Sequence, residues 1–427
     1  MSAPRAAQRL FLMSPTLPTS TRGLRRAAWS RAMEARALQV PGDQLKGAIA
    51  NWHHMGDQAQ QLALVRENAQ TRGPELTLAY RNVVHVTSGY RKRRSRSGAE
   101  RLVAEPCVVF VVRKKWAQGE RAADDLQRLP AHLMAWASID GQRVLCALPT
   151  DVQPEADLFG VRPRGASMGW TDEPDFPETG TLACVLEVSE GGQRLRFALS
   201  ALHVFSPQPH IDPPAASNGR AFLPLSASGA PLHAPPIVST VEFGGALRDS
   251  SSGLPSFDVQ LARIESPARV RAALADMPLS RQQPFITDEA MFERLASQHF
   301  FDLVVPENHP DRPQTPRPRM VCEFSRWLNR AQTIPYNARR GTTRVVCNAL
   351  HTQLVEMKIR GPNQPLPGDS GCALVVYLGD GTCTLAGLFI ASHDKLPFAY
   401  AIPAWHLFDP SAYFDLPDGA SLRPVNP

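Results

Sequence analysis

The segment PGDSGCALVV, residues 367–376, is the most informative stretch of this 427-residue sequence. A serine close to two glycines suits a tight turn, and the apolar run that follows predicts a β-strand. We expect such a turn to expose the hydroxyl group of Ser370 and to direct successive backbone N–H groups toward one point. Acyl transfer needs both features, because it requires a reachable nucleophile and donors for the developing oxyanion. On its own, however, the segment could also be an ordinary polar turn.

Two further segments contain residue types that could complete an acyl-transfer site. In FALSALHV, residues 197–204, an apolar strand runs into small residues and then a single histidine, His203. In SFDVQLARI, residues 256–264, Asp258 opens a strand of alternating polarity. Taken singly, His203 could be a core histidine and Asp258 a simple turn cap. The three candidate residues follow one another in the order His, Asp, Ser, and this order distinguishes between the known arrangements of such sites.

In that order and in those contexts, the three segments resemble the motifs of trypsin-like serine peptidases with the chymotrypsin fold. Motifs of that family typically read T-A-x-H, D-[IV]-A-L-[IL]-[RK]-[LI] and G-D-S-G, whereas α/β-hydrolases and subtilisins arrange the same triad in other orders. The segments AGLFIAS, residues 386–392, and FAYAIP, residues 398–403, are similar to the family's late strand and to its Y-A-[IN]-P segment. The resemblance covers about residues 165–408. It departs from the family pattern at Val204, where secreted members usually have a cysteine.

A narrower resemblance extends toward the N-terminus. The segments ASMG, residues 166–169, and GTLAC, residues 180–184, are similar to intracellular trypsin-like peptidases of the plant narrow-leaf type and to their bacterial relatives. Those proteins often carry a small N-terminal α+β domain. The outline of that domain fits VVRKK at residues 111–115 and PTDV at residues 149–152.

The fold expected from the texture of the sequence is mainly β. Short apolar segments alternate with turns rich in Gly, Pro, Ser and Asn, and the 39 prolines disfavour long helices. Helical periodicity appears in pieces such as Ala59–Arg72. Together with the resemblance, this predicts a double β-barrel, chymotrypsin-like protease domain over residues 161–427. A helical or flexible segment (residues 1–75) and a small α+β accessory domain (residues 76–160) would precede it, with a linker over residues 149–163.

The resemblance also implies a role for each site residue. The chain would be a serine endopeptidase that hydrolyses peptide bonds of a protein or peptide substrate through an acyl-enzyme intermediate, without a metal or organic cofactor. Ser370 would attack, His203 would act as the general base, and Asp258 would orient the imidazole. The backbone N–H groups of Gly368 and Ser370 would form the oxyanion hole. The expected substrate pocket contains Gln364, Ile390, Ala391 and Ser392.

Three expectations concern the neighbours of Ser370. Gln364 lies at the position that selects the side chain before the cleaved bond in this family, and because it is neutral we expect no simple preference for Arg or Lys. Asp369 is expected to be held by an internal side chain or by backbone N–H groups, because the sequence offers no apolar new N-terminus of the kind that activates secreted relatives. Cys372 would share a face with Ser370 if both belonged to one strand, and it could then be mistaken for the nucleophile.

Two alternative functions remain open at this point. The net charge of +6 allows a nucleic-acid-binding protein, but the basic residues are scattered except for RKRRSR at residues 91–96. That run lies between two β-like segments and is expected to be a solvated hairpin loop, which disfavours nucleic acid as a partner. The other alternative is a catalytically silent, protease-like binding module, against which the complete set of triad residues argues. The oligomeric state is left open.

Cysteine usage and the N-terminal composition bear on localisation. The seven cysteines are odd in number and lack C-x-x-C spacing, which indicates reduced thiols and predicts a cytoplasmic protein of bacterial origin. An arginine-rich start ahead of the first acidic residue, Glu34, leaves organellar targeting as a minor alternative. No apolar run approaches the roughly 18 residues of a membrane span, so no membrane partner is expected.

Overall fold

The computed structural model describes most of the chain beyond residue 41. The described residues are 42–80, 82–94, 100–113, 115, 129–154, 161–163, 181–190, 192–205, 211, 238–264, 274, 277–305, 319–328, 331–340, 343–366, 368–414 and 416–425. Within these ranges, no helix is both long enough and apolar enough to cross a membrane.

Two helices, α2 (Gly42–His54) and α3 (Gln58–Ala79), open the described part of the chain. The helix expected over residues 59–72 is confirmed, and it is longer than expected. Its buried side continues to Leu76 and Ala79, which pack with the accessory strands in one apolar cluster. The boundary expected at residue 75 therefore falls inside α3, because the apolar face of the helix continues past that residue.

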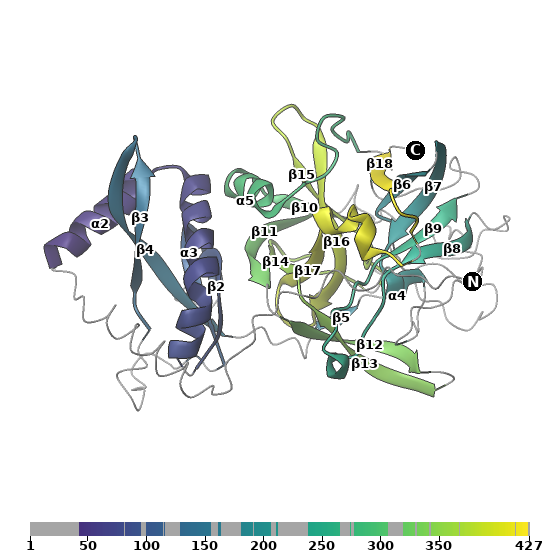
Figure 1. Ribbon diagram of the computed structural model, residues 1–427, viewed down its shortest axis with the longest axis horizontal. Coiled ribbons are helices and arrows are strands. Elements are labelled where there is room, and N and C mark those ends of the chain that lie inside the picture. The colour runs from purple at the N-terminus through teal and green to yellow at the C-terminus, as the bar shows by residue number, and fades with distance from the viewer. Residues whose placement is uncertain are drawn as a thin grey trace, which may run out of the picture.

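Four strands form a layer beside these helices (Figure 1). They are β1 (Val83–Arg94), β2 (Glu100–Val112), β3 (His132–Ile139) and β4 (Gln142–Pro154). Strands β1 and β2 form an antiparallel hairpin, β2 pairs in parallel with β4, and β3 pairs antiparallel with β4. We call these four strands, together with α2 and α3, the accessory layer.

The linker expected over residues 149–163 is partly strand. Residues 150–154 belong to β4 and pair with residues 108–112 of β2. A short strand, β5 (Val161–Pro163), then pairs with β16 (Cys383–His393). Hydrogen bonding to β2 and β16 therefore orders both ends of the segment that was expected to be a connection.

Six antiparallel strands close into a barrel. In order around the barrel they are β10 (Phe301–Val304), β15 (Ala373–Tyr377), β16 (Cys383–His393), β17 (Phe398–Pro403), β14 (Leu354–Ile359) and β11 (Arg319–Leu328). The barrel closes because β10 pairs with both β15 and β11. Helix α5 (Glu289–Gln298) precedes β10.

A second antiparallel sheet lies beside the barrel (Figure 1). Its five strands, in sheet order, are β18 (Ser421–Val425), β6 (Cys184–Glu190), β7 (Gln193–Ser200), β9 (Gln260–Ile264) and β8 (Val238–Gly244). A separate hairpin consists of β12 (Gln332–Arg340) and β13 (Thr343–His351). The remaining short helices are α4 (Leu202–Phe205), η3 (Ser250–Ser252), α6 (Ala404–Leu407) and η5 (Pro410–Ala412).

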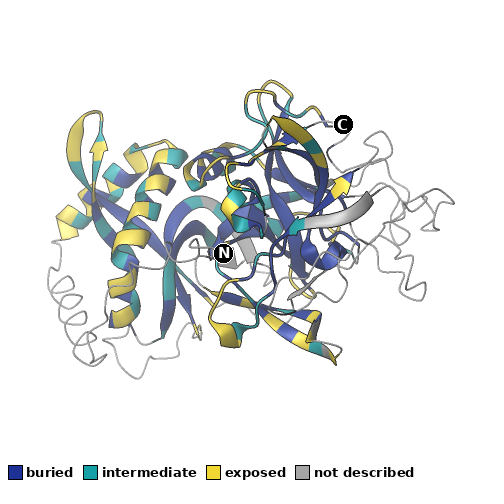
Figure 2. Cartoon of the chain, turned by 45° about the vertical axis from the view of Figure 1, so that its right-hand side comes forward, coloured by how far each residue is buried: buried dark blue, intermediate teal, exposed yellow. Residues whose placement is uncertain are grey.

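One continuous apolar core fills the barrel and the five-stranded sheet. Figure 2 shows the strands of both mostly buried, while the helices α2 and α3 expose one side. A second apolar cluster lies between these helices and the accessory strands. The expected mainly β class is confirmed, and a closed barrel packed against a second antiparallel sheet is consistent with a chymotrypsin-like fold.

The accessory layer joins the barrel through β1. Strand β1 pairs with β11 at Gly89 and Arg326, so the accessory strands and the barrel strands form one continuous sheet. A Cβ on Gly89 would lie 2.7 Å from the backbone oxygen of Ser325. Only glycine permits this approach of the two backbones.

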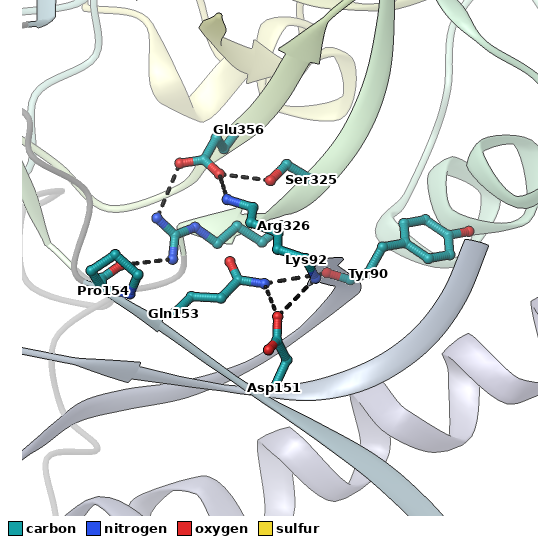
Figure 3. Close-up of polar contacts among 8 residues, drawn as sticks. All are labelled: Tyr90, Lys92, Asp151, Gln153, Pro154, Ser325, Arg326 and Glu356. Carbon is teal, nitrogen blue, oxygen red and sulfur yellow. Dashed lines mark hydrogen bonds and ion pairs between the residues drawn. The ribbon is translucent and has the colours of Figure 1, made fainter. Parts of the chain in front are cut away.

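A buried polar cluster crosses this joint (Figure 3). The carboxylate of Glu356 lies 3.1 Å from Nη2 of Arg326 and 3.2 Å from Nζ of Lys92, and it accepts the hydroxyl proton of Ser325 at 2.7 Å. Lys92 belongs to β1, whereas the other three residues belong to the barrel strands β11 and β14. Arg326 also donates to the backbone oxygen of Pro154 in β4 at 3.4 Å. The cluster therefore links the two parts of the molecule by charge as well as by backbone pairing.

The basic run at residues 91–96 was expected to be a solvated hairpin loop, but its first four residues belong to a strand. Residues 91–94 extend β1, and residues 92–94 pair with β2. Arg91 forms an ion pair with Glu105, and Lys92 forms one with Glu356. Long-range carboxylate partners, which are invisible in the local sequence, thus hold the first two cations within a strand.

Replacing Glu356 with leucine is expected to lower the free energy of unfolding by about 3–5 kcal/mol, because Arg326 and Lys92 would remain buried without their shared counter-charge. Urea denaturation measures the loss. The control is the double variant Glu356→Leu/Arg326→Met, which should recover part of the stability, since it removes one of the two buried cations that lack a counter-charge. A single variant as stable as the wild type would contradict the role assigned to the cluster.

The same cluster predicts a dependence of stability on pH. Burial alone would raise the pKa of Glu356, but the charges of Arg326 and Lys92 and the hydrogen bonds from Ser325 and Arg326 lower it to about 2. The ionised carboxylate therefore stabilises the fold fully above its ordinary pKa of 4.5, and this contribution is lost as the pH falls toward 2. We expect the wild type to lose more stability than the double variant over that interval.

Candidate active site

His203 and Asp258 meet at one end of the five-stranded sheet. His203 lies in α4, which directly follows β7, and Asp258 lies just before β9. Strands β7 and β9 are neighbours, so their pairing brings the two segments together. Nδ1 of His203 is 2.7 Å from Oδ2 of Asp258, and the backbone N–H of His203 donates to Oδ1 at 3.1 Å. Both oxygens of the carboxylate are therefore engaged by the histidine.

The electrostatics of this pair suit a general base. Burial alone would raise the pKa of Asp258, but the interaction with His203 and the hydrogen bonds that His203 donates lower that pKa below its ordinary value. The ionised carboxylate binds the Nδ1 proton of His203, which leaves the lone pair on Nε2. Nε2 is buried, and it has no hydrogen-bond partner among the residues that the structure describes. Nε2 of His203 can therefore accept a proton from the hydroxyl group of an attacking nucleophile.

Ser370 lies in a tight turn immediately before β15. The expectation that this turn exposes its hydroxyl group is wrong, because Ser370 is fully buried. Gly368 and Gly371 flank it with φ angles of 105° and 87°, a region of backbone conformation that favours glycine. A Cβ on Gly371 would also lie 2.1 Å from the backbone oxygen of Thr181. The hydroxyl of Ser370 donates to the backbone oxygen of Ile390 at 3.1 Å.

Thr181 and Ser200 connect the turn of Ser370 to the strand that leads to His203. The backbone N–H of Thr181 donates to the oxygen of Ser370 at 2.8 Å, and its hydroxyl donates to the oxygen of Gly368 at 2.8 Å. Ser200, the last residue of β7, donates its hydroxyl to the oxygen of Thr181 at 2.6 Å. Because Ser200 lies three residues before His203, these bonds fix the serine turn relative to the segment that carries the imidazole. Sequence reasoning missed both residues, and the only signal was a small polar residue beside each strand end.

Cys372 and Ser370 do not lie in one strand, which differs from the arrangement considered from the sequence. Strand β15 begins at Ala373, and the positive φ of Gly371 interrupts any regular alternation before it. The argument that residues 370 and 372 share a face therefore does not apply. Cys372 is fully buried.

The expected substrate-pocket residues fall into two groups. Ile390, Ala391 and Ser392 are buried in β16, and Ile390 contacts Ser370 through its backbone oxygen. Gln364 lies on an exposed segment between β14 and the serine turn. The structure thus places Ile390 against Ser370, whereas the pocket roles of Ile390, Ala391, Ser392 and Gln364 stay predictions.

Asp369 is fully buried beside the candidate nucleophile. Its Oδ2 accepts the backbone N–H of Leu366 at 2.7 Å, which is the kind of internal partner that the sequence predicted. The N–H groups of Asp369, Gly371 and Cys372 donate to backbone oxygens within the fold. The oxyanion role expected for the N–H groups of Gly368 and Ser370 stays a prediction.

All seven cysteines lie in the described ranges, where they are buried and form no disulfide. Among the residues described, no group of three or more His, Cys, Asp or Glu side chains is placed to hold a metal ion.

No protein-family model matches the sequence, and no curated protein matches it. Several solved structures are similar in part. The NS6 protease from murine norovirus 1 shares 14% identity over 48% of this chain and 80% of its own, with a TM-score of 0.22. Kallikrein-related peptidase 10 in complex with Zn2+ shares 12% identity over 52% of this chain and 91% of its own, with a TM-score of 0.21. Protease Anisep from Arthrobacter nicotinovorans shares 11% identity over 53% of this chain and 90% of its own, with a TM-score of 0.23. All three are proteases or peptidases by name, but scores this low do not define the activity of this chain.

Proposed function

We propose that the chain is a serine endopeptidase that cleaves peptide bonds of a protein or peptide substrate. The observation that carries this proposal is the buried pair of His203 and Asp258, which presents Nε2 as a base. The bonds through Thr181 and Ser200 tie this pair to the turn that carries Ser370. A nucleophile, a base and an orienting carboxylate are the groups that acyl transfer requires.

The proposed reaction proceeds in two halves. Oγ of Ser370 attacks the carbonyl carbon of the substrate while Nε2 of His203 takes the hydroxyl proton. The C–N bond then breaks, and the departing amine receives that proton from Nε2, which leaves an ester on Ser370. Water attacks this ester with the same base, and the acid product leaves.

Two features of the chain serve this sequence of steps. Asp258 stabilises the imidazolium that forms after each attack, and the N–H groups of Gly368 and Ser370 are proposed to bind the oxyanion. The hydroxyl of Ser370 exchanges its bond to Ile390 for one to Nε2 when substrate arrives, since catalytic hydrogen bonds often tighten only in the complex.

The other functions considered from the sequence have less support. A nucleic-acid-binding surface would need the cations of the basic run, but carboxylates already neutralise Arg91 and Lys92. A silent binding module would not need a buried, oriented histidine, because an unpartnered buried nitrogen costs stability without serving a purpose.

Covalent reagents separate serine chemistry from cysteine chemistry. We expect a fluorophosphonate to abolish peptide hydrolysis by the wild type and iodoacetamide to leave it intact, because the proposed reaction uses the hydroxyl of Ser370 and not the thiol of Cys372. The variant Cys372→Ala is expected to keep its activity within about threefold, since buried structural thiols are inert. Both reagents are applied to both proteins, and hydrolysis of a peptide mixture is followed by mass spectrometry. Loss of activity in Cys372→Ala, together with inactivation of the wild type by iodoacetamide, would contradict the proposal.

A further inference from the structure

Two aromatic residues of the β12–β13 hairpin lie behind the carboxylate of Asp258. Tyr336 is in the middle of β12 and is 1% exposed, and His351 ends β13 and is 2% exposed. Backbone hydrogen bonds attach this hairpin to the segment that carries Asp258. The backbone N–H of Ser256 donates to the backbone oxygen of Leu350 at 2.5 Å, and the backbone N–H of Leu350 donates to the backbone oxygen of Arg248 at 3.2 Å. The hairpin is therefore fixed relative to the carboxylate.

The side chains form a continuous series of contacts. Oη of Tyr336 lies 3.2 Å from Nε2 of His351. The ring of Tyr336 packs edge-on against the ring of His203, with 5.5 Å between the centroids. The hydroxyl of Tyr336 also lies near the carboxylate of Asp258, whose negative charge acts to raise the pKa of the phenol. One tyrosine thus packs against His203, forms a hydrogen bond with His351 and faces the carboxylate of Asp258.

The protonation states set the direction of these hydrogen bonds. Burial raises the pKa of Tyr336 well above its ordinary value, and the charge and hydrogen bond of Asp258 raise it further. The phenol therefore keeps its proton and can donate it to the carboxylate. Burial lowers the pKa of His351 to about 4, so this imidazole is neutral at physiological pH. Because the single phenolic proton is used on Asp258, the oxygen of Tyr336 accepts the Nε2 proton of His351.

We propose that Tyr336, held by His351, is a positioning residue that fixes the carboxylate of Asp258 and tunes its effect on His203. The inference rests on the proposed peptidase function. Asp258 then receives three donors, two from His203 and one from Tyr336, so its carboxylate has one orientation. The phenolic donor also offsets part of the negative charge that His203 experiences.

The groups around His203 determine how removing the hydroxyl of Tyr336 would change the proton affinity of its imidazole. Asp258 contacts His203 directly, Tyr336 packs against it from β12, and His351 acts on it electrostatically from β13. Cys347 of β13 is a further titratable neighbour of Tyr336. Removing the phenolic hydroxyl therefore leaves the carboxylate more negative and less well oriented, which should favour the protonated imidazole and slow its action as a base.

The test measures the rate of covalent labelling by a fluorophosphonate between pH 5 and 9. Tyr336→Phe is expected to lower the limiting rate about tenfold, the scale of a hydrogen bond to a charged group. It is also expected to move the midpoint of the pH profile upward by about half a pH unit, because the donor no longer offsets the carboxylate charge. Binding of the reagent before reaction should not change.

Three further variants give the measurement its controls. Tyr413→Phe removes another buried phenolic hydroxyl, which donates to the oxygen of Leu407 at 2.6 Å, and it should keep the wild-type profile. His351→Gln keeps an N–H donor near the position of Nε2 and should stay close to the wild type. His351→Leu removes the donor and should shift the profile in the same direction as Tyr336→Phe.

The outcomes separate the inference from the function on which it rests. A wild type that the fluorophosphonate does not label overturns the proposed function and this inference with it. A labelled wild type whose pH midpoint is unchanged in Tyr336→Phe overturns only the positioning role, even if that variant reacts more slowly. If Tyr336→Phe fails to fold, the two His351 variants decide, and identical profiles for glutamine and leucine overturn the role.

Discussion

Replacing Ser370 with alanine is expected to reduce peptide hydrolysis by about a millionfold, because the proposed reaction loses its nucleophile and the remaining groups act as one unit with it. The turn should survive the change. Its shape is set by Gly368, by Gly371 and by the bonds of Thr181 to the backbone, and none of these involves the hydroxyl of Ser370. Hydrolysis of a peptide mixture, followed by mass spectrometry, gives the rate, and circular dichroism checks that the fold is retained.

A second serine supplies the matched control for this substitution. Ser280 is buried in a different loop, where its hydroxyl accepts the backbone N–H of Gln283 at 3.2 Å. Ser280→Ala is expected to keep its activity while it loses a comparable buried hydroxyl. Full activity in Ser370→Ala would show that hydrolysis, if present, uses another nucleophile.

Replacing Asp258 with asparagine is expected to lower kcat by about 10^4-fold while KM changes little. The side chain keeps its size, but its amide nitrogen cannot accept the Nδ1 proton of His203. The imidazole would then favour the tautomer that carries its proton on Nε2, and such an imidazole cannot take a proton from Ser370. Steady-state kinetics on a peptide that the wild type cleaves would measure both constants.

The control for the carboxylate is Asp249, nine residues earlier on the same segment. Asp249 caps the short helix η3 at the surface and accepts the backbone N–H of Ser251 at 3.0 Å. Asp249→Asn should therefore leave kcat unchanged. Equal kcat values for Asp258→Asn and the wild type would remove Asp258 from the proposed mechanism.

Local patterns predicted much of the fold. The helix over residues 59–72 and the mainly β class both follow from periodicity and turn chemistry within short windows. The extension of β1 through Arg91 and Lys92 could not be predicted in this way. It depends on Glu105 and Glu356, and Glu356 lies far along the chain. The same reason explains why residues 149–163 were expected to be a linker, because β5 pairs with β16, which lies far along the chain.

The candidate site was predictable where each residue has a short motif of its own. His203 and Asp258 were identified from strand-flanking motifs, and the pairing of β7 with β9 places them together. Tyr336 and His351 lie within ordinary apolar strands, so nothing local marks them. Their part in the site arises only when the β12–β13 hairpin is attached to the segment of Asp258.

The central claim is that Ser370 is a nucleophile activated by His203. The measurement that tests it most directly is the mass spectrum of the intact wild-type protein after reaction with a fluorophosphonate, followed by peptide mapping of the adduct. One adduct per chain, located on Ser370 and absent from both Ser370→Ala and His203→Ala, is the predicted result. An unmodified wild-type protein, or an adduct located at another residue, would contradict the claim.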